Sequence, residues 1–352
     1  MRALVLSGGE GSRLRPLTHT NAKQLIPIAG QPILFHALEA IRDAGIVEVG
    51  IVIGQTGEEV RAAVGDGSRW GLKVTYIPQE APLGLAHAVM TAASFVRGEP
   101  FLMYLGDNVL LEGVSRFVEG FERTRPDAQI LLTRVAEPEH FGVAVLEGDR
   151  VVRLVEKPKE FVSDIALVGV YLFDDSILDA CATLRPSWRG EYEITEAIQW
   201  LIDHGKNVRA EMVGGYWKDT GRPEDLLEAN RMMLATRAPS IEGDVDAATT
   251  VEGTVVVGPG ATVVASRLIG PLVLGPGVRV EASTLGPDVS VEEGCEIVRS
   301  TVRDSILMQG CRVSDVDGLA GSILGRNVEV RHSGSHKVHR LVVGDQSRVE
   351  VD

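Results

Sequence analysis

The stretch LSGGEGSRLRPLT, residues 6–18, decides how the first part of this chain folds. It continues the apolar run RALVL, residues 2–6, which has the length and composition of a buried strand. A glycine-rich turn after a strand can point several backbone N–H groups at one spot, which suits a phosphate. Arg13 and Lys23 follow with the positive charge that a polyphosphate needs. The stretch therefore predicts a strand followed by a polyphosphate-binding loop formed by Gly8, Gly9 and Gly11.

Two well-known glycine-rich loops do not fit this stretch. A dinucleotide fingerprint needs a glycine at its sixth place, which is Leu14 when the count starts at Gly9. An ATPase loop needs Gly-Lys-Ser/Thr, and no such triplet occurs here. A tight turn that only connects two elements stays open on these residues alone.

The composition is that of a globular protein, with 352 residues, 44% of them hydrophobic and 24% charged, which is enough for two domains. No apolar run approaches the roughly 18 residues of a membrane span, and we expect no signal peptide. The three cysteines are widely spaced, which predicts a reducing cytoplasm rather than a disulfide framework or a metal cluster. A net charge of −14 argues against a nucleic-acid surface. A nucleoside triphosphate would need local arginine and lysine, and a metal.

Helices and strands alternate after the glycine loop. We expect helices over residues 32–44, 58–64 and 85–96, and strands over residues 47–53, 72–77 and 101–105. This alternation predicts an α/β domain with a Rossmann-like, mostly parallel sheet and helices on both faces. Ligands of such sheets bind beyond the carboxyl ends of the strands, where the glycine loop, Gln79 and Asp107 fall.

Two isolated aspartates stand at predicted strand ends, Asp107 in LGDN and Asp219 in WKDTG. Either one alone could cap the next turn. Together, two carboxylates from separate strand ends can hold one Mg²⁺ that also binds phosphate oxygens.

Gln79 follows a strand and precedes a helix, where its side chain could contact a ligand. Its amide offers both a donor and an acceptor to the edge of a pyrimidine base. A solvent-facing glutamine at a helix start is the alternative. His87, in the same stretch, is interpreted as a packing or surface residue.

The middle of the chain carries charged residues that suit a sugar phosphate. Glu156 can accept hydrogen bonds from sugar hydroxyls, while Lys157 and Arg189 can hold a phosphate. Gly142 lies in a strand where a ring could rest against the backbone. An exposed salt bridge is the alternative for the adjacent pair Glu156 and Lys157.

The last third of the chain loses its helical periodicity from Gly243 onward. Apolar residues recur six apart, which marks a parallel β-helix whose rungs bury one apolar residue each. The recurring residues are Val257, Val263 and Ile269, then Leu274 and Val280, then Leu285, Val291 and Ile297. We expect an irregular loop or a register slip over residues 301–321, where the period weakens.

Eight motifs together resemble one known family. In chain order they are the glycine loop, Lys-Gln, Gln-Gly, Gly-Asp-Asn, Phe-Gly-Val, Glu-Lys-Pro, Arg-Gly-Glu and Asp-Thr-Gly, over residues 1–235. Their types and order resemble those of the sugar-1-phosphate nucleotidylyltransferases. The variant Lys23-Gln24-Leu25 is most similar to the thymidylyltransferases of this family, and the length and tail resemble their long form.

The resemblance implies a role for individual residues. It implies that Asp107 and Asp219 bind Mg²⁺ as metal ligands, and that the catalytic residues are Arg13, Lys23, Asp107, Lys157 and Asp219. It implies nucleotide binding by Leu6, Gly8, Gly9, Gly11, Ser12, Arg13, Lys23, Gln24, Gln79, Gly84 and Asp107. It implies sugar-phosphate binding by Asn108, Gly142, Glu156, Lys157, Leu167, Tyr171 and Arg189.

We therefore expect a catalytic nucleotidyltransferase domain over residues 1–240 and a left-handed parallel β-helix over residues 241–352. The implied reaction joins dTTP and glucose 1-phosphate into dTDP-glucose and pyrophosphate, in a cytoplasmic homo-oligomer that binds neither nucleic acid nor membrane. The alternatives are a uridylyltransferase or a broad-specificity enzyme, a bifunctional enzyme with an acetyltransferase β-helix that would use His332, His336 or His339, and a non-catalytic regulatory subunit.

Overall fold

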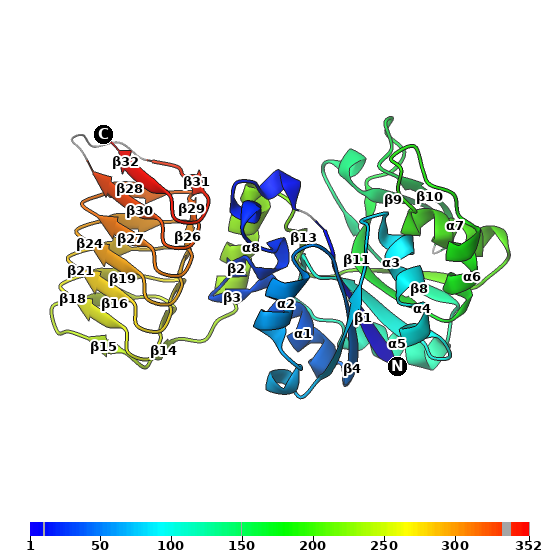
Figure 1. Ribbon diagram of the computed structural model, residues 1–352, viewed down its shortest axis with the longest axis horizontal. Coiled ribbons are helices and arrows are strands. Elements are labelled where there is room, and N and C mark those ends of the chain that lie inside the picture. The colour runs from blue at the N-terminus through cyan, green and yellow to red at the C-terminus, as the bar shows by residue number, and fades with distance from the viewer. Residues whose placement is uncertain (10, 149, 333–338, 352) are drawn as a thin grey trace. The chain divides into compact units, whose positions relative to one another are not determined.

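The computed structural model of the chain describes residues 1–9, 11–148, 150–332 and 339–351 (Figure 1). The chain forms two compact units: the first comprises Met1–Glu10 and Leu34–Asp219, and the second comprises Gly11–Ile33 and Thr220–Asp352. The segment that follows the glycine loop is therefore grouped with the C-terminal third. The domain boundary at residue 240 stays a prediction.

The first unit is built on a sheet that has nine strands in the described part of the chain. Its order is β10-β9-β11-β6-β1-β4-β5, and β8 and β12 continue from β11. The strands are β1 (Arg2–Ser7), β4 (Glu48–Ile53), β5 (Lys73–Pro78), β6 (Phe101–Leu105), β8 (Ala128–Arg134), β9 (Gly142–Glu147), β10 (Arg150–Glu156), β11 (Ile165–Phe173) and β12 (Val208–Met212).

Strand β1 lies at the centre of the parallel half of this sheet. It pairs in parallel with β4 on one side and β6 on the other, and β4 pairs in parallel with β5. Such a strand is covered on both faces, which is why residues 3–6 are all apolar and buried. Antiparallel strands join where β11 pairs with β6, β8 and β9. The predicted α/β class is confirmed.

The helices of the first unit follow the predicted alternation with one difference. The helix expected over residues 85–96 consists of two helices joined at Ala92, whose φ of −89° and ψ of 5° depart from helical values. The helices are α1 (Ile33–Asp43, whose first residue belongs to the second unit), α2 (Gly57–Val64), α3 (Leu85–Thr91), α4 (Ala93–Val96), α5 (Ser115–Thr124), α6 (Ser176–Thr183) and α7 (Ile194–Asp203).

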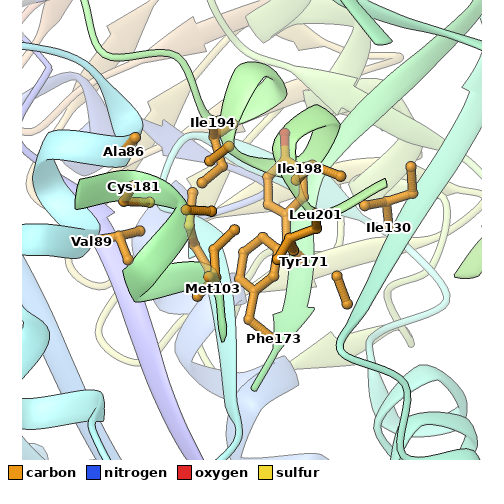
Figure 2. Close-up of a cluster of buried hydrophobic side chains, with 14 of the residues drawn as sticks. Ala86, Val89, Met103, Ile130, Tyr171, Phe173, Cys181, Ile194, Ile198 and Leu201 are labelled. Atoms are coloured by element: carbon orange, nitrogen blue, oxygen red, sulfur yellow. The ribbon is translucent and has the colours of Figure 1, made fainter. Parts of the chain in front are cut away.

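A buried apolar cluster fixes three of these helices to the sheet. Figure 2 shows Met103 and Tyr171 from the sheet among side chains of α3, α6 and α7, such as Val89, Cys181 and Ile198. Tyr171 stacks on Phe173 with ring centroids 5.8 Å apart. The cluster holds the strand ends of the candidate site in fixed positions.

The second unit consists of a parallel β-helix, the helix α8 (Pro223–Leu234) and the segment Gly11–Ile33. The β-helix has three parallel sheets, whose strands appear as stacked layers from yellow to red in Figure 1. The first contains β14 (Ser240–Ile241), β17 (Val255–Val257), β20 (Leu272–Leu274), β23 (Val289–Val291), β26 (Ser305–Leu307), β29 (Ile323–Leu324) and β31 (Val342–Val343).

The second sheet contains β15 (Asp244–Val245), β18 (Thr262–Val264), β21 (Arg279–Glu281), β24 (Glu296–Val298), β27 (Arg312–Ser314), β30 (Glu329–His332) and β32 (Arg348–Val351). The third contains β16 (Thr250–Glu252), β19 (Arg267–Ile269), β22 (Thr284–Leu285), β25 (Thr301–Arg303) and β28 (Asp317–Ala320). The predicted parallel β-helix is confirmed.

The hexapeptide period needs a correction on the third sheet. Val257 and Val263 point inward as predicted, but the next buried apolar residue is Leu268, and Ile269 is half-buried. One coil takes 17 residues, as the stacked serines show, so that one of its three sides is a residue shorter than the others. At that corner the hydroxyl of Ser266 accepts a hydrogen bond from the backbone N–H of Ser283 at 3.1 Å in the next coil. This hydrogen bond between neighbouring coils holds the corner at the shorter side.

The irregular loop expected over residues 301–321 is not found in this described part of the chain, because β25 to β28 continue the stack. The expected register slip is present: Thr301 pairs with Asp317 while Val302 pairs with Leu319, so that Gly318 forms a bulge. Further on, His332 ends β30, His339 bridges to Leu319, and His336 lies outside the described residues.

Helix α8 packs on the β-helix through polar and charged side chains. Arg231 holds the carboxylate of Asp304 through two hydrogen bonds of 2.7 and 3.1 Å. Asn230 accepts hydrogen bonds from the N–H of Ala29 and the hydroxyl of Ser290. These contacts join the segment Gly11–Ile33, α8 and the β-helix into one unit.

Within the described residues, no helix has the length and apolarity that a membrane span requires.

Candidate functional site

The glycine loop begins where β1 ends, and its first glycine lies against the predicted base-reading residue. A Cβ on Gly8 would lie 3.1 Å from Gln79 Oε1, so the carboxamide of Gln79 rests on the backbone of the loop. The carbonyl of Leu6 accepts a hydrogen bond from Gly106 N–H at 2.9 Å, and Gly9 is exposed. The fold thus brings Gly8 and Gln79 together, as expected for parallel strands that end at one edge.

The carboxamide of Gln79 has a second neighbour, His87 at the start of α3. Gln79 Nε2 lies 2.8 Å from His87 Nδ1. The ring of His87 stacks on Tyr192 with centroids 6.2 Å apart. His87, interpreted from sequence as packing or surface, therefore contacts a candidate site residue directly.

Gly84 lies in the turn between Gln79 and α3, and only glycine fits there. Its φ is +104°, and a Cβ would lie 2.6 Å from the carbonyl oxygen of Tyr192. Tyr192 donates its N–H to Leu83 O at 2.8 Å and accepts from Ala86 N–H at 3.0 Å. The backbone of Tyr192 therefore fixes the turn that the resemblance assigns to the nucleotide.

The two candidate metal ligands lie on a two-stranded ribbon of the first unit. Strand β7 (Asn108–Leu110) pairs in antiparallel fashion with β13 (Trp217–Asp219), and Asp219 lies directly opposite Asn108. Asp107 is the residue before this pair and is buried, with 8% of its surface exposed. The ribbon therefore places both residues at one end, although they are more than one hundred residues apart in the sequence.

Asn108 orients this end of the ribbon through three hydrogen bonds. Its Nδ2 donates to Asp107 Oδ1 at 3.1 Å, and its Oδ1 accepts from Trp217 Nε1 at 2.7 Å and from Gly169 N–H at 3.2 Å. A Cβ on Gly169 would lie 2.6 Å from Asn108 Oδ1, so no side chain fits there. Asn108, predicted to bind the sugar phosphate, thus also holds the carboxylate of Asp107 in place.

The predicted sugar side contains a cluster around Glu156, at the end of β10. Glu156 Oε2 accepts a hydrogen bond from Thr195 Oγ1 at 3.1 Å. A Cβ on Gly142 would lie 3.0 Å from Glu156 Oε2 and 2.6 Å from Thr195 Cγ2. Burial, and then the negative charge of Glu193, raises the pKa of the Glu156 carboxyl. Gly142, Glu156 and Thr195 therefore form one compact, partly desolvated group.

The two predicted phosphate-binding cations differ in their surroundings. Arg189 is surrounded by carboxylates, with Nη2 2.7 Å from Glu191 Oε1 and Nη1 3.2 Å from Glu193 Oε1. Its contact with Glu156 is longer, at 3.5 Å. Lys157 has a φ of +39°, an uncommon value for a residue with a side chain, and its Nζ lies 4.0 Å from Glu156 Oε1. A phosphate at Arg189 would compete with the carboxylates of Glu191 and Glu193. At Lys157 it would compete with a single, longer ion pair to Glu156.

Two further residues predicted for the sugar phosphate are almost fully buried. Leu167 and Tyr171 are 5% and 4% exposed and belong to the apolar cluster of Figure 2. Burial, and then the charge of Glu156, raises the pKa of the Tyr171 phenol. Leu167 and Tyr171 therefore belong to the core of the first unit.

The second unit carries the basic part of the glycine loop. Gly11 has a φ of +64°, and a Cβ there would lie 2.9 Å from Thr18 Cγ2 and 3.0 Å from Lys23 Cβ. Thr18 Oγ1 donates to the carbonyl of Gly11 at 2.8 Å, which closes the loop. This close approach requires glycine and fixes the stem of Lys23 beside the loop.

Arg13, Ser12 and Gln24 complete this part of the loop. The guanidinium of Arg13 lies on the backbone of Gly221, since a Cβ there would be 2.8 Å from Arg13 Nη2. Ser12 is exposed, whereas Gln24 is buried and its Oε1 has no hydrogen-bond partner among the described residues.

The chain combines a nucleotidyltransferase α/β sheet with a parallel β-helix. A sequence profile described as nucleotidyl transferase matches residues 2–236, and the chain therefore belongs to this family.

Proteins similar to this chain are glucose-1-phosphate thymidylyltransferases. It is 52% identical to the one from Streptomyces griseus over 100% of this chain and 99% of that protein. It is 50% identical to the one from Streptomyces antibioticus over 100% of this chain and 99% of that protein. It also resembles the crystal structure of a candidate glucose-1-phosphate thymidylyltransferase from Bacillus anthracis in complex with sucrose. That structure has a TM-score of 0.63 at 33% identity, covering 66% of this chain and 94% of the other.

Sequence reasoning did not identify four residues that shape the site, namely His87, Gly169, Thr195 and Trp217. Each acts through a neighbour that was identified: His87 through Gln79, Thr195 through Glu156, and Trp217 and Gly169 through Asn108. Trp217 lies two residues before Asp219, within a motif that the sequence analysis quoted. Its hydrogen bond to Asn108 could not be predicted from sequence, because it depends on the pairing of β7 with β13.

Proposed function

We propose that this chain transfers a thymidylyl group from dTTP to glucose 1-phosphate, giving dTDP-glucose and pyrophosphate. The observation that carries the proposal is the β7–β13 ribbon, which places Asp107 and Asp219 at one end. Full-length identity of 52% with a protein named glucose-1-phosphate thymidylyltransferase supports the choice of substrates.

The chemistry is an in-line displacement at phosphorus. An oxygen of the glucose 1-phosphate attacks the α-phosphorus of dTTP, and the bond to the bridging oxygen of pyrophosphate breaks on the opposite side. A phosphate dianion is already nucleophilic, so no general base is needed. Catalysis therefore comes from positioning and from stabilisation of negative charge.

Mg²⁺ fits the residues that the ribbon brings together. Asp107 and Asp219 offer hard carboxylate oxygens, and the hydrogen bond from Asn108 orients one of them. Bound there, Mg²⁺ would neutralise charge on phosphate oxygens. In this proposal the two aspartates are the metal ligands.

Cations of the chain bind the phosphates on either side of the reaction. We assign Arg13 and Lys23 to the triphosphate of dTTP, because both follow the glycine loop and Lys23 is held against Gly11. Lys157 is assigned to the phosphate of glucose 1-phosphate. Arg189, engaged by Glu191 and Glu193, is assigned to the same phosphate with a weaker hold.

The remaining site residues select the two substrates. Gln79 pairs with the edge of the thymine, and Gly84 and Gly8 allow the close approach of the nucleotide. Glu156, oriented by Thr195, accepts hydrogen bonds from sugar hydroxyls beside Gly142. The homo-oligomeric state and the cytoplasmic location stay predictions, and light scattering of the purified chain tests the first.

The test is pyrophosphate release with glucose 1-phosphate, Mg²⁺ and dTTP, UTP, ATP, CTP or GTP in parallel. Asp107→Asn and Asp219→Asn should lose turnover by at least about 100-fold while keeping their circular dichroism. Asp179→Asn, which changes an exposed carboxylate on α6, is the matched control and should keep wild-type turnover.

A preference for dTTP supports the proposal in full. Equal or better use of UTP would keep the mechanism and change the assignment to a uridylyltransferase or broad-specificity enzyme. Near-normal turnover of Asp107→Asn would refute the assignment of the metal ligands.

A further inference from the structure

The carboxamide of Gln79 is held between two neighbours, His87 on one side and the backbone of Gly8 on the other. Gln79 Nε2 lies 2.8 Å from His87 Nδ1. An amide nitrogen can only donate, and an imidazole nitrogen without a proton can accept from it. Gln79 Oε1 lies on the side of Gly8, where a Cβ would be 3.1 Å away. The two ends of the amide are thus distinguished by their surroundings.

The ring of His87 is itself fixed. Its backbone carbonyl accepts a hydrogen bond from Thr91 Oγ1 at 2.9 Å within α3. The ring stacks on Tyr192 at a centroid distance of 6.2 Å and an interplanar angle of 29°. Tyr192 in turn binds Leu83 and Ala86 through its backbone. These contacts fix the plane of the His87 ring beside Gln79.

The orientation of an amide decides which base it can pair with. With one N–H of Gln79 directed to His87, the amide has an oxygen acceptor and one further N–H donor available. Thymine and uracil present an N3–H donor beside a carbonyl acceptor, which complement that pair. Cytosine presents a bare N3 acceptor at the same place, so its lone pair would face Gln79 Oε1. Pairing with cytosine would require the amide to rotate by half a turn.

We propose that His87 is a specificity-determining positioning residue: by accepting a hydrogen bond from Gln79, it fixes the amide orientation that selects thymine or uracil over cytosine. The proposal rests on the proposed function, in which Gln79 reads the base. It adds a residue that acts through Gln79, and it explains discrimination among pyrimidines by an amide orientation rather than by pocket size.

The test compares His87→Phe with His87→Asn in the full-length protein with Mg²⁺ and glucose 1-phosphate. Phenylalanine keeps a ring against Tyr192 but removes the acceptor, so the amide of Gln79 is free to rotate. The ratio of kcat/KM for dTTP to that for dCTP should fall by about tenfold to a hundredfold, the range of one hydrogen-bonded base contact. Asparagine supplies an acceptor oxygen near the position of Nδ1 and should restore most of the ratio.

Two further readouts separate this role from a structural one. The KM for glucose 1-phosphate should stay within about twofold in both variants, because Glu156 and Lys157 are not touched. In a Gln79→Leu background, His87→Phe should leave the dTTP to dCTP ratio unchanged, since the residue through which it acts is gone.

Each outcome decides between the two proposals. If His87→Phe keeps the dTTP to dCTP ratio while Gln79→Leu lowers it, the inference about His87 is wrong and the proposed function stands. If Gln79→Leu leaves the ratio unchanged, Gln79 does not read the base, and both the inference and that part of the proposed function fail. If His87→Phe does not fold, the same comparison with His87→Leu and His87→Asn gives the result.

Discussion

Replacing Asn230 by leucine tests the hydrogen-bonded junction of the second unit. Asn230 lies on α8 and is fully buried. Its Oδ1 accepts hydrogen bonds from Ala29 N–H at 2.8 Å and from the hydroxyl of Ser290 at 2.6 Å, and its Nδ2 lies 3.4 Å from the carbonyl of Asp288. One side chain thus joins the segment behind the glycine loop, α8 and strand β23.

The magnitude follows from what the substitution leaves behind. Leucine has the branching of asparagine but a larger volume, so overpacking at this fully buried position adds to the loss of the polar contacts. Ala29 and Ser290 are both fully buried, and each polar group left without a partner costs about 1–3 kcal/mol. The contact with Asp288 is long and contributes little. We expect Asn230→Leu to lower the free energy of unfolding by about 2–5 kcal/mol.

Urea unfolding followed by far-UV circular dichroism measures this change. The matched control is Glu224→Gln on the same helix, which breaks the exposed ion pair of Glu224 with Arg340 and should cost less than about 1 kcal/mol. Adding Ser290→Ala to Asn230→Leu should cost less than the sum of the two single changes, since both remove one hydrogen bond. A loss for Asn230→Leu no larger than that of the control would refute the reasoning.

Three further predictions concern the site and the β-helix. Gly169→Ala would place a Cβ 2.6 Å from Asn108 Oδ1, so the Mg²⁺ concentration for half-maximal turnover should rise about tenfold to a hundredfold, as measured by Mg²⁺ titration; an unchanged requirement would contradict the role of Asn108. Gly11→Ala, at a φ of +64° and against Lys23, should raise the KM for dTTP about tenfold and leave that for glucose 1-phosphate unchanged, as steady-state kinetics would show. Burial raises the pKa of the Glu292 carboxyl to about 7 from 4.5, so the stabilisation from its proton is complete below 4.5 and is lost as the pH rises through 7. Glu292→Gln should therefore be more stable than the wild type by about 2–3 kcal/mol above pH 7 and equal to it below 4.5. Thermal melts of both proteins across this pH range measure the difference, and a difference in Tm that does not change with pH would contradict the prediction.

The sequence by itself determined the classes of element and the candidate residues. The apolar run of β1 predicts a buried strand because a parallel strand is covered on both faces, and β1 indeed lies between β4 and β6. The apolar repeat predicts a parallel β-helix because each coil buries its residue against the next. The strict six-residue repeat predicts the wrong inward residue at Ile269, because Leu268 is the buried one. A 17-residue coil has one side shorter than six residues, and the local sequence does not show which side that is.

Only the tertiary structure decided which residues act together and how each side chain is oriented. Asp107 and Asp219 come to the same end of one ribbon because β7 pairs with β13, a register that neither local sequence contains. Gln79 contacts His87, and Asn108 accepts a hydrogen bond from Trp217, although these partners are distant in sequence or lie on different elements. The physical reason is that local sequence sets backbone preference and burial, whereas hydrogen-bond partners depend on distances that exist only after the strands and helices have packed.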